Sequence, residues 1–316
     1  MSRTQETPIE TGAFKEMVRD LVSRLPTTEV DGAYTTEPAW YHRMVGELFK
    51  LPRNSDGARQ VERILSTGAL TIATLANQYA EERVTPMRSC PDPWPILTPQ
   101  QWAEGYQKAH PDLDASCIVE MGDGLVISAW CDQRVFWRPN LLRLGKVLDI
   151  KKPYDQYGLV LQHLAGLLLA SYGERNFYNY REGALTEKHV RLLKTTREYM
   201  EYTDRNAAGD YVAEIGSSGL TYAGYSVRNA RGDIEATTDR WAWPAFVVGN
   251  ILLVDHVRLG SNGLLHIDCP GDEYDPGGES EFEFCLCFRF DDRLEFDYAY
   301  VGHPYGYWGS AAGLRR

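Results

Sequence analysis

Two charged side chains, Asp149 and Lys151, stand two residues apart in a short apolar run. In a β-strand, residues i and i+2 point to the same face, so a strand over residues 146–151 would place this carboxylate and this ammonium group side by side. Leu148 and Ile150 would then face the opposite way, into a core. A carboxylate beside an ammonium group can hold a divalent ion and orient a phosphate or a water molecule. We therefore expect any catalytic chemistry of this chain at this strand.

Four short strands between two helices are expected to position these side chains. The strands are predicted at residues 117–121, 125–130, 134–137 and 146–151, the first two of them forming a hairpin about a Gly-Asp-Gly turn. The helix before them covers residues 99–110, and the helix after them covers residues 155–172. The second helix is apolar nearly all round, so we expect it to be buried on more than one side.

This order of elements, together with the Leu-Asp-Ile-Lys-Lys-Pro run, resembles the core of the PD-(D/E)xK nuclease superfamily. The resemblance implies that Asp149 is a metal-binding carboxylate and that Lys151 orients the attacking water and stabilises the phosphorane charge. The upstream acid of the family pattern has two candidates, since Asp132 begins a predicted strand, whereas Asp112 has a literal Pro-Asp pair but precedes the hairpin. Glu104 would be the acid on the preceding helix.

A nuclease of this kind needs a metal ion, because phosphodiester hydrolysis requires charge neutralisation on the scissile phosphate and a hydroxide at neutral pH. Neighbouring strands lie about 5 Å apart, so carboxylates on two of them can reach one ion. We therefore predict that Asp132 and Asp149 bind Mg²⁺ and that the substrate is nucleic acid. The competing interpretation of Asp149 and Lys151 is an exposed Asp-Lys pair on an edge strand.

The net charge of −11 is unevenly distributed. Residues 268–297 hold eleven acids against two arginines, whereas residues 132–152 hold six basic side chains against two acids. The basic stretch favours a polyanionic substrate, although a solvated basic face has the same composition. The acidic segment indicates a second class of function. In this alternative, the protein is a non-catalytic binding or assembly protein, for example a viral structural or defence-related component, and it binds a basic protein partner or forms an oligomer.

The sequence after residue 210 predicts an antiparallel sheet, preceded by a helix over residues 186–202. Its strands are expected at residues 211–215, 220–227, 245–257, 264–268, 282–290 and 294–301. In the last two, phenylalanines alternate with polar residues and cysteines, which predicts a hairpin about Asp291 and Asp292 with one buried face.

A remote alternative rests on His266, Asp268 and His303. These residues resemble the H-x-D…H pattern of 2-oxoglutarate-dependent Fe(II) oxygenases, which implies an iron site, with Arg315 binding the acid group of the co-substrate. The interval between the two histidines is short for that family. A histidine and an aspartate that form local hydrogen bonds at a strand end would give the same residues.

Other features restrict the remaining classes. The N-terminal residues are polar, and no run approaches the roughly 20 apolar residues of a membrane span, so we expect an intracellular, cytoplasmic protein without a signal peptide or a membrane partner. The six cysteines are scattered, which predicts reduced thiols. Sequence patterns of P-loop enzymes, α/β-hydrolases, Rossmann dehydrogenases and zinc sites are absent.

The predicted fold class is α+β, in three regions. Residues 1–98 form a helical region that ends in a proline-rich connector, with helices expected at 11–25, at 37–51 and from Ser55 to Tyr79. Residues 99–182 form the nuclease-like mixed α/β core. Residues 183–316 form a helix and an antiparallel, β-rich acidic region.

Overall fold

A computed structural model describes residues 83–122 and 134–315, which belong to one compact unit, Glu82–Arg316. The helices predicted before Glu82, the strand predicted at residues 125–130 and the candidate metal ligand Asp132 lie outside the described residues.

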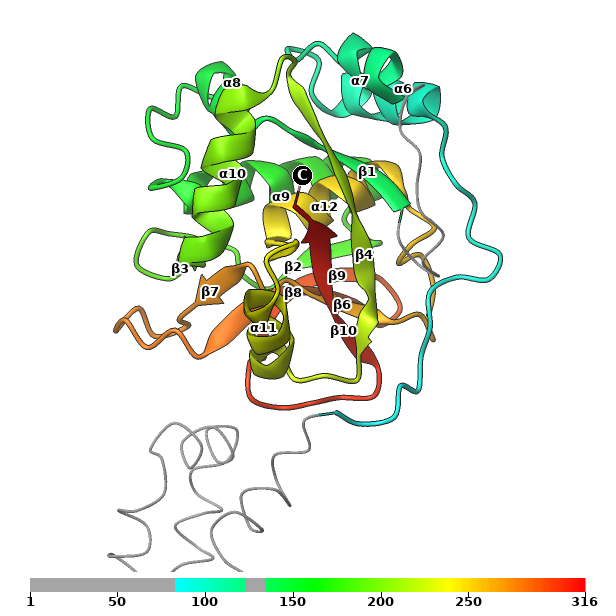
Figure 1. The fold of residues 1–316 in the computed structure, drawn as a ribbon, viewed down its shortest axis with the longest axis vertical. Coiled ribbons are helices and arrows are strands. Elements are labelled where there is room, and N and C mark those ends of the chain that lie inside the picture. Colours follow the sequence, from blue (N-terminus) through cyan, green and yellow to red (C-terminus); the bar gives the residue numbers. More distant parts are fainter. Residues whose placement is uncertain (1–82, 123–133, 316) are drawn as a thin grey trace, which may run out of the picture. The chain divides into compact units, whose positions relative to one another are not determined.

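Helices and strands of the described residues form an α+β fold, as predicted (Figure 1). The helices are α6 (Pro99–Ala109), α7 (Ser116–Gly122), α8 (Leu141–Val147), α9 (Tyr157–Tyr172), α10 (Lys194–Asn206), α11 (Val227–Ala236) and α12 (Ala245–Val254). The strands are β1 (Arg134–Pro139), β2 (Phe177–Asn179), β3 (Val190–Leu192), β4 (Tyr211–Ala223), β5 (Arg240–Ala242), β6 (His266–Asp268), β7 (Asp272–Tyr274), β8 (Phe284–Phe290), β9 (Leu294–Tyr300) and β10 (Trp308–Leu314).

The ten described strands belong to one mixed sheet, in which seven follow the order β1-β4-β10-β6-β8-β7-β3. The strand β9 pairs with β8, β2 pairs with β9, and β5 pairs with β10. Two of the pairs, β6 with β10 and β2 with β9, are parallel, and the others are antiparallel. Strands from residues 99–182 and from residues 183–316 therefore share this sheet. Because β9 is the partner of β2 among the described strands, β2 is an outer strand.

The two faces of the sheet are covered by different helices. Leu286 and Phe288 of β8 belong to the main core, which also includes the buried side chains of α9 and α12. Cys285 points to the opposite face, where it packs against Val227 of α11. Figure 1 shows α9 and α12 together on one side of the sheet and α11 on the other. The predicted β8–β9 hairpin is confirmed, but the expectation of a single buried face is wrong because α11 covers Cys285.

The apolar run at residues 245–257, predicted as a strand, forms the helix α12. Nine of the ten residues of α12 are buried, so the sequence shows no polar face that would distinguish a helix from a buried strand. Pro244 precedes its first turn, and the Asp272 carboxylate of β7 accepts a hydrogen bond from the Ala245 N–H at 2.6 Å. The N-terminus of this buried helix is therefore satisfied by a side chain from the sheet.

One more predicted strand is a helix, and one predicted helix begins later than expected. Residues 117–121, predicted as a strand, lie in α7, where the Asp114 carboxylate accepts a hydrogen bond from the Ser116 N–H at 2.9 Å. The helix predicted at 186–202 begins only at Lys194, because residues 190–192 pair with β7 as β3. The predictions of α6, β1 and α9 are confirmed.

A buried ionic network joins β1, β4, α8 and α10. Arg138 is fully buried and donates to Asp204 at 2.6 Å and to Glu214 at 2.8 Å. Asp204 also accepts from the Tyr154 hydroxyl at 2.5 Å and from the Leu141 N–H at 2.9 Å, at the start of α8. Each charge in this network has hydrogen-bond partners, as burial of charged groups requires.

Candidate functional site

The structure corrects the strand predicted at residues 146–151. Asp149 and Lys151 lie in the turn and bend that follow α8, and both side chains are exposed. Asp149 has φ of 54°, in the left-handed region, and the Ile150 N–H donates to the Gly145 carbonyl at 2.7 Å. Strand alternation therefore does not place Asp149 and Lys151 on one face, because these residues follow a helix and do not form a strand.

The other predicted nuclease residues do not lie in one cluster within the described part of the chain. Asp112 is exposed in the turn after α6. Glu104 is exposed on α6 and accepts a hydrogen bond from Gln100 at 2.8 Å. Asp132 lies outside the described residues, and within residues 83–122 and 134–315 no three His, Cys, Asp or Glu side chains form a group that could hold a metal ion. Binding of Mg²⁺ by Asp132 and Asp149 stays a prediction.

The residues of the oxygenase alternative come from three segments, which are β6, the loop after β9 and the residue that follows β10. His266 and Asp268 lie on one face of β6, and both are buried. His266 contacts Arg88, and burial, with a smaller effect of Arg88, lowers the pKa of this imidazole to about 4. His303 lies in the loop after β9 and contacts the ring of Tyr305, and the Arg315 guanidinium lies over Tyr199. These described side chains form no metal-binding group.

Many acids of the segment 268–297 are turned inward or paired. Asp268, Asp272, Asp275 and Glu295 are buried, and the Asp275 carboxylate accepts main-chain hydrogen bonds within its own loop. The exposed acids of the segment are Glu279, Glu281, Asp291 and Asp292. The segment therefore presents much less negative charge to a partner than its composition indicates.

Two buried carboxyl groups in this segment have strongly perturbed proton affinity. Burial raises the pKa of Asp268 to about 7, and the nearby Arg231 offsets this only in part. Burial also raises the pKa of Asp272 to about 7, although its carboxylate accepts from the Ala245 N–H. The Oδ1 atom of Asp268 has no hydrogen-bond partner among the described residues. Both groups favour the neutral acid because the surrounding sheet and helices exclude water.

One serine–histidine contact lacks the arrangement of a hydrolase. Ser171 Oγ lies 3.1 Å from His256 Nε2 at the end of α9. The same Nε2 lies 3.0 Å from the Leu253 carbonyl oxygen, which can only accept a hydrogen bond. Nε2 therefore carries the proton and cannot take one from Ser171.

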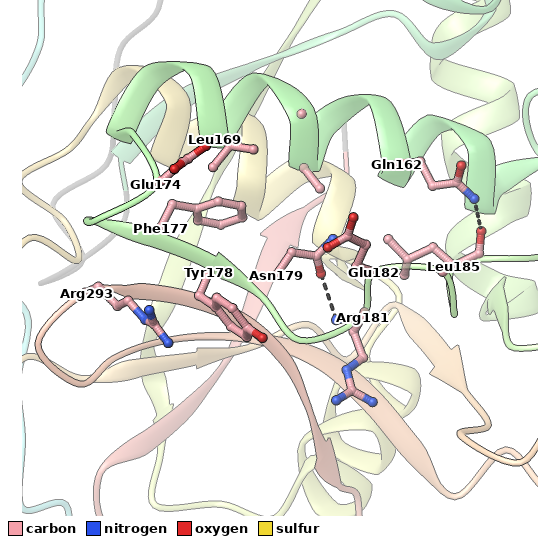
Figure 2. Close-up of a pocket in the computed structure, with 13 residues that line it drawn as sticks. Gln162, Leu169, Glu174, Phe177, Tyr178, Asn179, Arg181, Glu182, Leu185 and Arg293 are labelled. Atoms are coloured by element: carbon pink, nitrogen blue, oxygen red, sulfur yellow. Dashed lines mark hydrogen bonds between the residues drawn. The ribbon is translucent and has the colours of Figure 1, made fainter.

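A groove of about 600 Å³ runs between α9 and β2. Its apolar surface comes from Ala165, Gly166 and Leu169 of α9, from Phe177 of β2 and from Leu185 of the following loop. In Figure 2, Phe177, Asn179 and Glu182 project toward α9, whereas Tyr178 and Arg293 lie on the other side of β2. The groove therefore borders the outer strand of the sheet.

The helix that forms one wall of this groove carries no Asp, Glu, Lys or Arg in its sixteen residues. The sequence predicts burial of α9 on more than one side, and its buried side chains do reach the main core. However, Leu159 is 44% exposed and Leu169 is 41% exposed, and an added Cβ at Gly166 would meet no atom within 4 Å. The absence of charge on an exposed helix face is the sequence signal for this surface.

The two arginines of the groove are paired with acids of β9. Arg181 lies 3.2 Å from Asp297, and Arg293 lies 3.5 Å from Glu295. The Arg293 guanidinium also lies over the ring of Tyr178, at 4.3 Å from its centroid. Arg289 pairs with the same two acids, at 2.7 Å from Glu295 and 3.3 Å from Asp297, and lies 3.9 Å from Asp291, so three arginines share three acids. Exposed tyrosine beside arginine is a composition typical of protein-recognition surfaces.

Comparisons identify no relative of this chain: no family model, no curated protein and no solved structure matches it. Among the described helices, none combines the length and apolarity that crossing a bilayer requires.

Proposed function

We propose that this protein is a binding or assembly protein that holds a polypeptide segment in the groove between α9 and β2. The observation that carries the proposal is the uncharged, exposed face of α9 beside an outer strand. Leu169, which lines the groove and is 41% exposed, would lose water-exposed apolar surface on binding, which favours association by roughly 25 cal/mol per Å² before the costs of ordering.

A polypeptide suits this surface better than a polyanion does. Nucleic acid binding relies on arginine and lysine side chains that are free to neutralise phosphates. Arg181 and Arg293 are already paired with Asp297 and Glu295. The apolar wall and the exposed Tyr178 are instead the kinds of contact that proteins use to bind one another.

The proposal is tested by selecting binders from a random peptide library on the full chain and then measuring their affinity for two tryptophan variants. Gly166→Trp fills the groove, whereas Gly232→Trp makes the same change on the exposed face of α11. An added Cβ meets no atom within 4 Å at either glycine, so both variants should fold. Selected peptides should bind Gly166→Trp at least about tenfold more weakly than Gly232→Trp. Equal affinity for the two variants would refute the proposal.

The nuclease prediction is separated from this one by a direct assay. The protein is incubated with Mg²⁺ or Mn²⁺ and with single- and double-stranded DNA and RNA, beside Asp149→Ala and Lys151→Ala. Since both side chains are exposed, neither replacement removes a buried contact. Metal-dependent cleavage that both variants lose would contradict a purely binding role and would place catalysis at this turn.

A further inference from the structure

We infer that the segment held by the groove is an extended peptide with basic side chains, which adds to the sheet as a strand beside β2. This inference rests on the proposed function and specifies the partner's backbone and charge. Three independent features support it: the open edge of β2, the two different surfaces above and below that edge, and the uncompensated acids of the groove.

The backbone of β2 is paired on one side only. The Leu294 N–H donates to the Asn176 carbonyl at 2.9 Å, and the Tyr180 N–H donates to the Phe296 carbonyl at 3.0 Å. In a parallel ladder, every second residue turns both of its main-chain groups to the same neighbour. The intervening residue Asn179 therefore turns its N–H and C=O away from β9.

The open edge offers three main-chain groups. The Phe177 N–H already donates to the Gly173 carbonyl at 3.0 Å, at the end of α9. This leaves the Phe177 C=O and both groups of Asn179, and no described strand pairs with them. An edge of this kind is what β-strand addition uses, because the main chain of the incoming peptide supplies the missing hydrogen bonds.

An added strand would place its alternate side chains against two different surfaces. Side chains on one face would meet the α9 wall at Gly166 and Leu169, and side chains on the other face would lie near Tyr178 and Arg293 (Figure 2). The first surface favours an apolar side chain, and the second favours a polar one.

The remaining charge of the groove is negative. Glu174 and Glu182 line the groove and are exposed, and neither forms an ion pair with another described residue. The two arginines of the groove, together with Arg289, are compensated by Asp291, Glu295 and Asp297. Lysine or arginine near Glu174 and Glu182 would complement this charge, whereas an acidic peptide would be repelled.

The test uses capped peptides of defined sequence and fluorescence anisotropy with the full chain. Lys-Thr-Val-Thr-Lys presents lysine, valine and lysine on one face when it is extended, and Glu-Thr-Val-Thr-Glu reverses its charge. The lysine peptide should bind at least about tenfold more tightly. This preference should disappear in a Glu174→Gln, Glu182→Gln double variant and persist in a Glu235→Gln, Glu279→Gln control, whose glutamates are exposed outside the groove.

Backbone pairing is tested with two versions of the lysine peptide, N-methylated on alternate sets of amides. Strand addition requires that one version loses binding and the other retains it, since only one set of amides faces β2. Equal binding by both methylated versions, equal binding of the acidic and basic peptides, or binding of neither peptide would overturn the inference. If library-selected peptides still bind Gly166→Trp more weakly than Gly232→Trp in any of these cases, peptide binding in the groove is supported and only strand addition by a basic peptide is refuted.

Discussion

Replacing Asp268 with asparagine should remove a large part of the stability that the protein loses as pH rises from 5 to 8. Burial raises the pKa of this carboxyl group from 3.8 to about 7, so the folded protein retains a proton there that the unfolded chain has lost. The native state binds more protons between these two values, and the free energy of unfolding therefore falls as pH rises through this window. Stability from this group is fully present below pH 3.8 and is lost by pH 7 and above.

The size of the effect follows from the two pKa values. Integration of the proton difference gives a loss of roughly 2 to 3 kcal/mol between pH 5 and pH 8 from Asp268 alone. Asp272, whose pKa is also raised to about 7, contributes a similar loss, so the wild-type protein should lose about 5 kcal/mol over this range. Asp268→Asn should lose about half as much, because asparagine stays neutral in both states.

The assay is equilibrium unfolding in urea at pH 5 and pH 8, followed by tryptophan fluorescence. Glu279→Gln, which neutralises an exposed carboxylate of the same acidic segment, is the matched control and should keep the wild-type pH dependence. If Asp268→Asn shows the same pH dependence as the wild type, burial of a protonated carboxyl group at this position is refuted.

Two further pairs of substitutions test the fold. Arg138→Met should lower the free energy of unfolding by roughly 3 to 5 kcal/mol, because it leaves two buried carboxylates without their cation. Arg143→Met, at an exposed pair, should lower it by less than about 1 kcal/mol. Similar losses for the two variants in denaturant unfolding would contradict this account. Gly224→Ala should lower the melting temperature clearly more than Gly183→Ala. Both glycines have positive φ, but only at Gly224 would the added Cβ lie 2.1 Å from the Val84 carbonyl oxygen, and equal shifts in calorimetry would show that this contact relaxes freely.

Hydrophobic alternation predicted the β8–β9 hairpin correctly because its period of two residues has a single structural interpretation. The stretch 141–151 shows where such reasoning fails. Leu141, Leu144 and Leu148 follow helical spacing, and the Asn140 side chain caps the helix by accepting from the Leu142 and Arg143 N–H groups. These helix signals lie just before the Asp-x-Lys triplet, and they override its strand-like alternation.

The groove was beyond prediction for a different reason. It is formed by the outer face of α9, by the edge of β2 and by Arg293, which enters through the β8–β9 turn. The parallel pairing of β2 with β9 brings these segments together, and pairing between distant strands leaves no local pattern in the sequence. The absence of charge on α9 was visible, but it is equally consistent with a helix buried on all sides.

The position of β10 in the sheet dictates the order in which the chain can complete its fold during synthesis. The strand β10 lies between β4 and β6, and it also pairs with β5, yet it follows the other described strands in the sequence. A nascent chain that has reached Tyr307 can already pair β4 with β1, but the opposite edge of β4 and the neighbouring edge of β6 still await their partner. Until residues 308–314 have emerged from the ribosome, these two edges stay unpaired and can mispair with other chains, and the pairing of β10 then closes both.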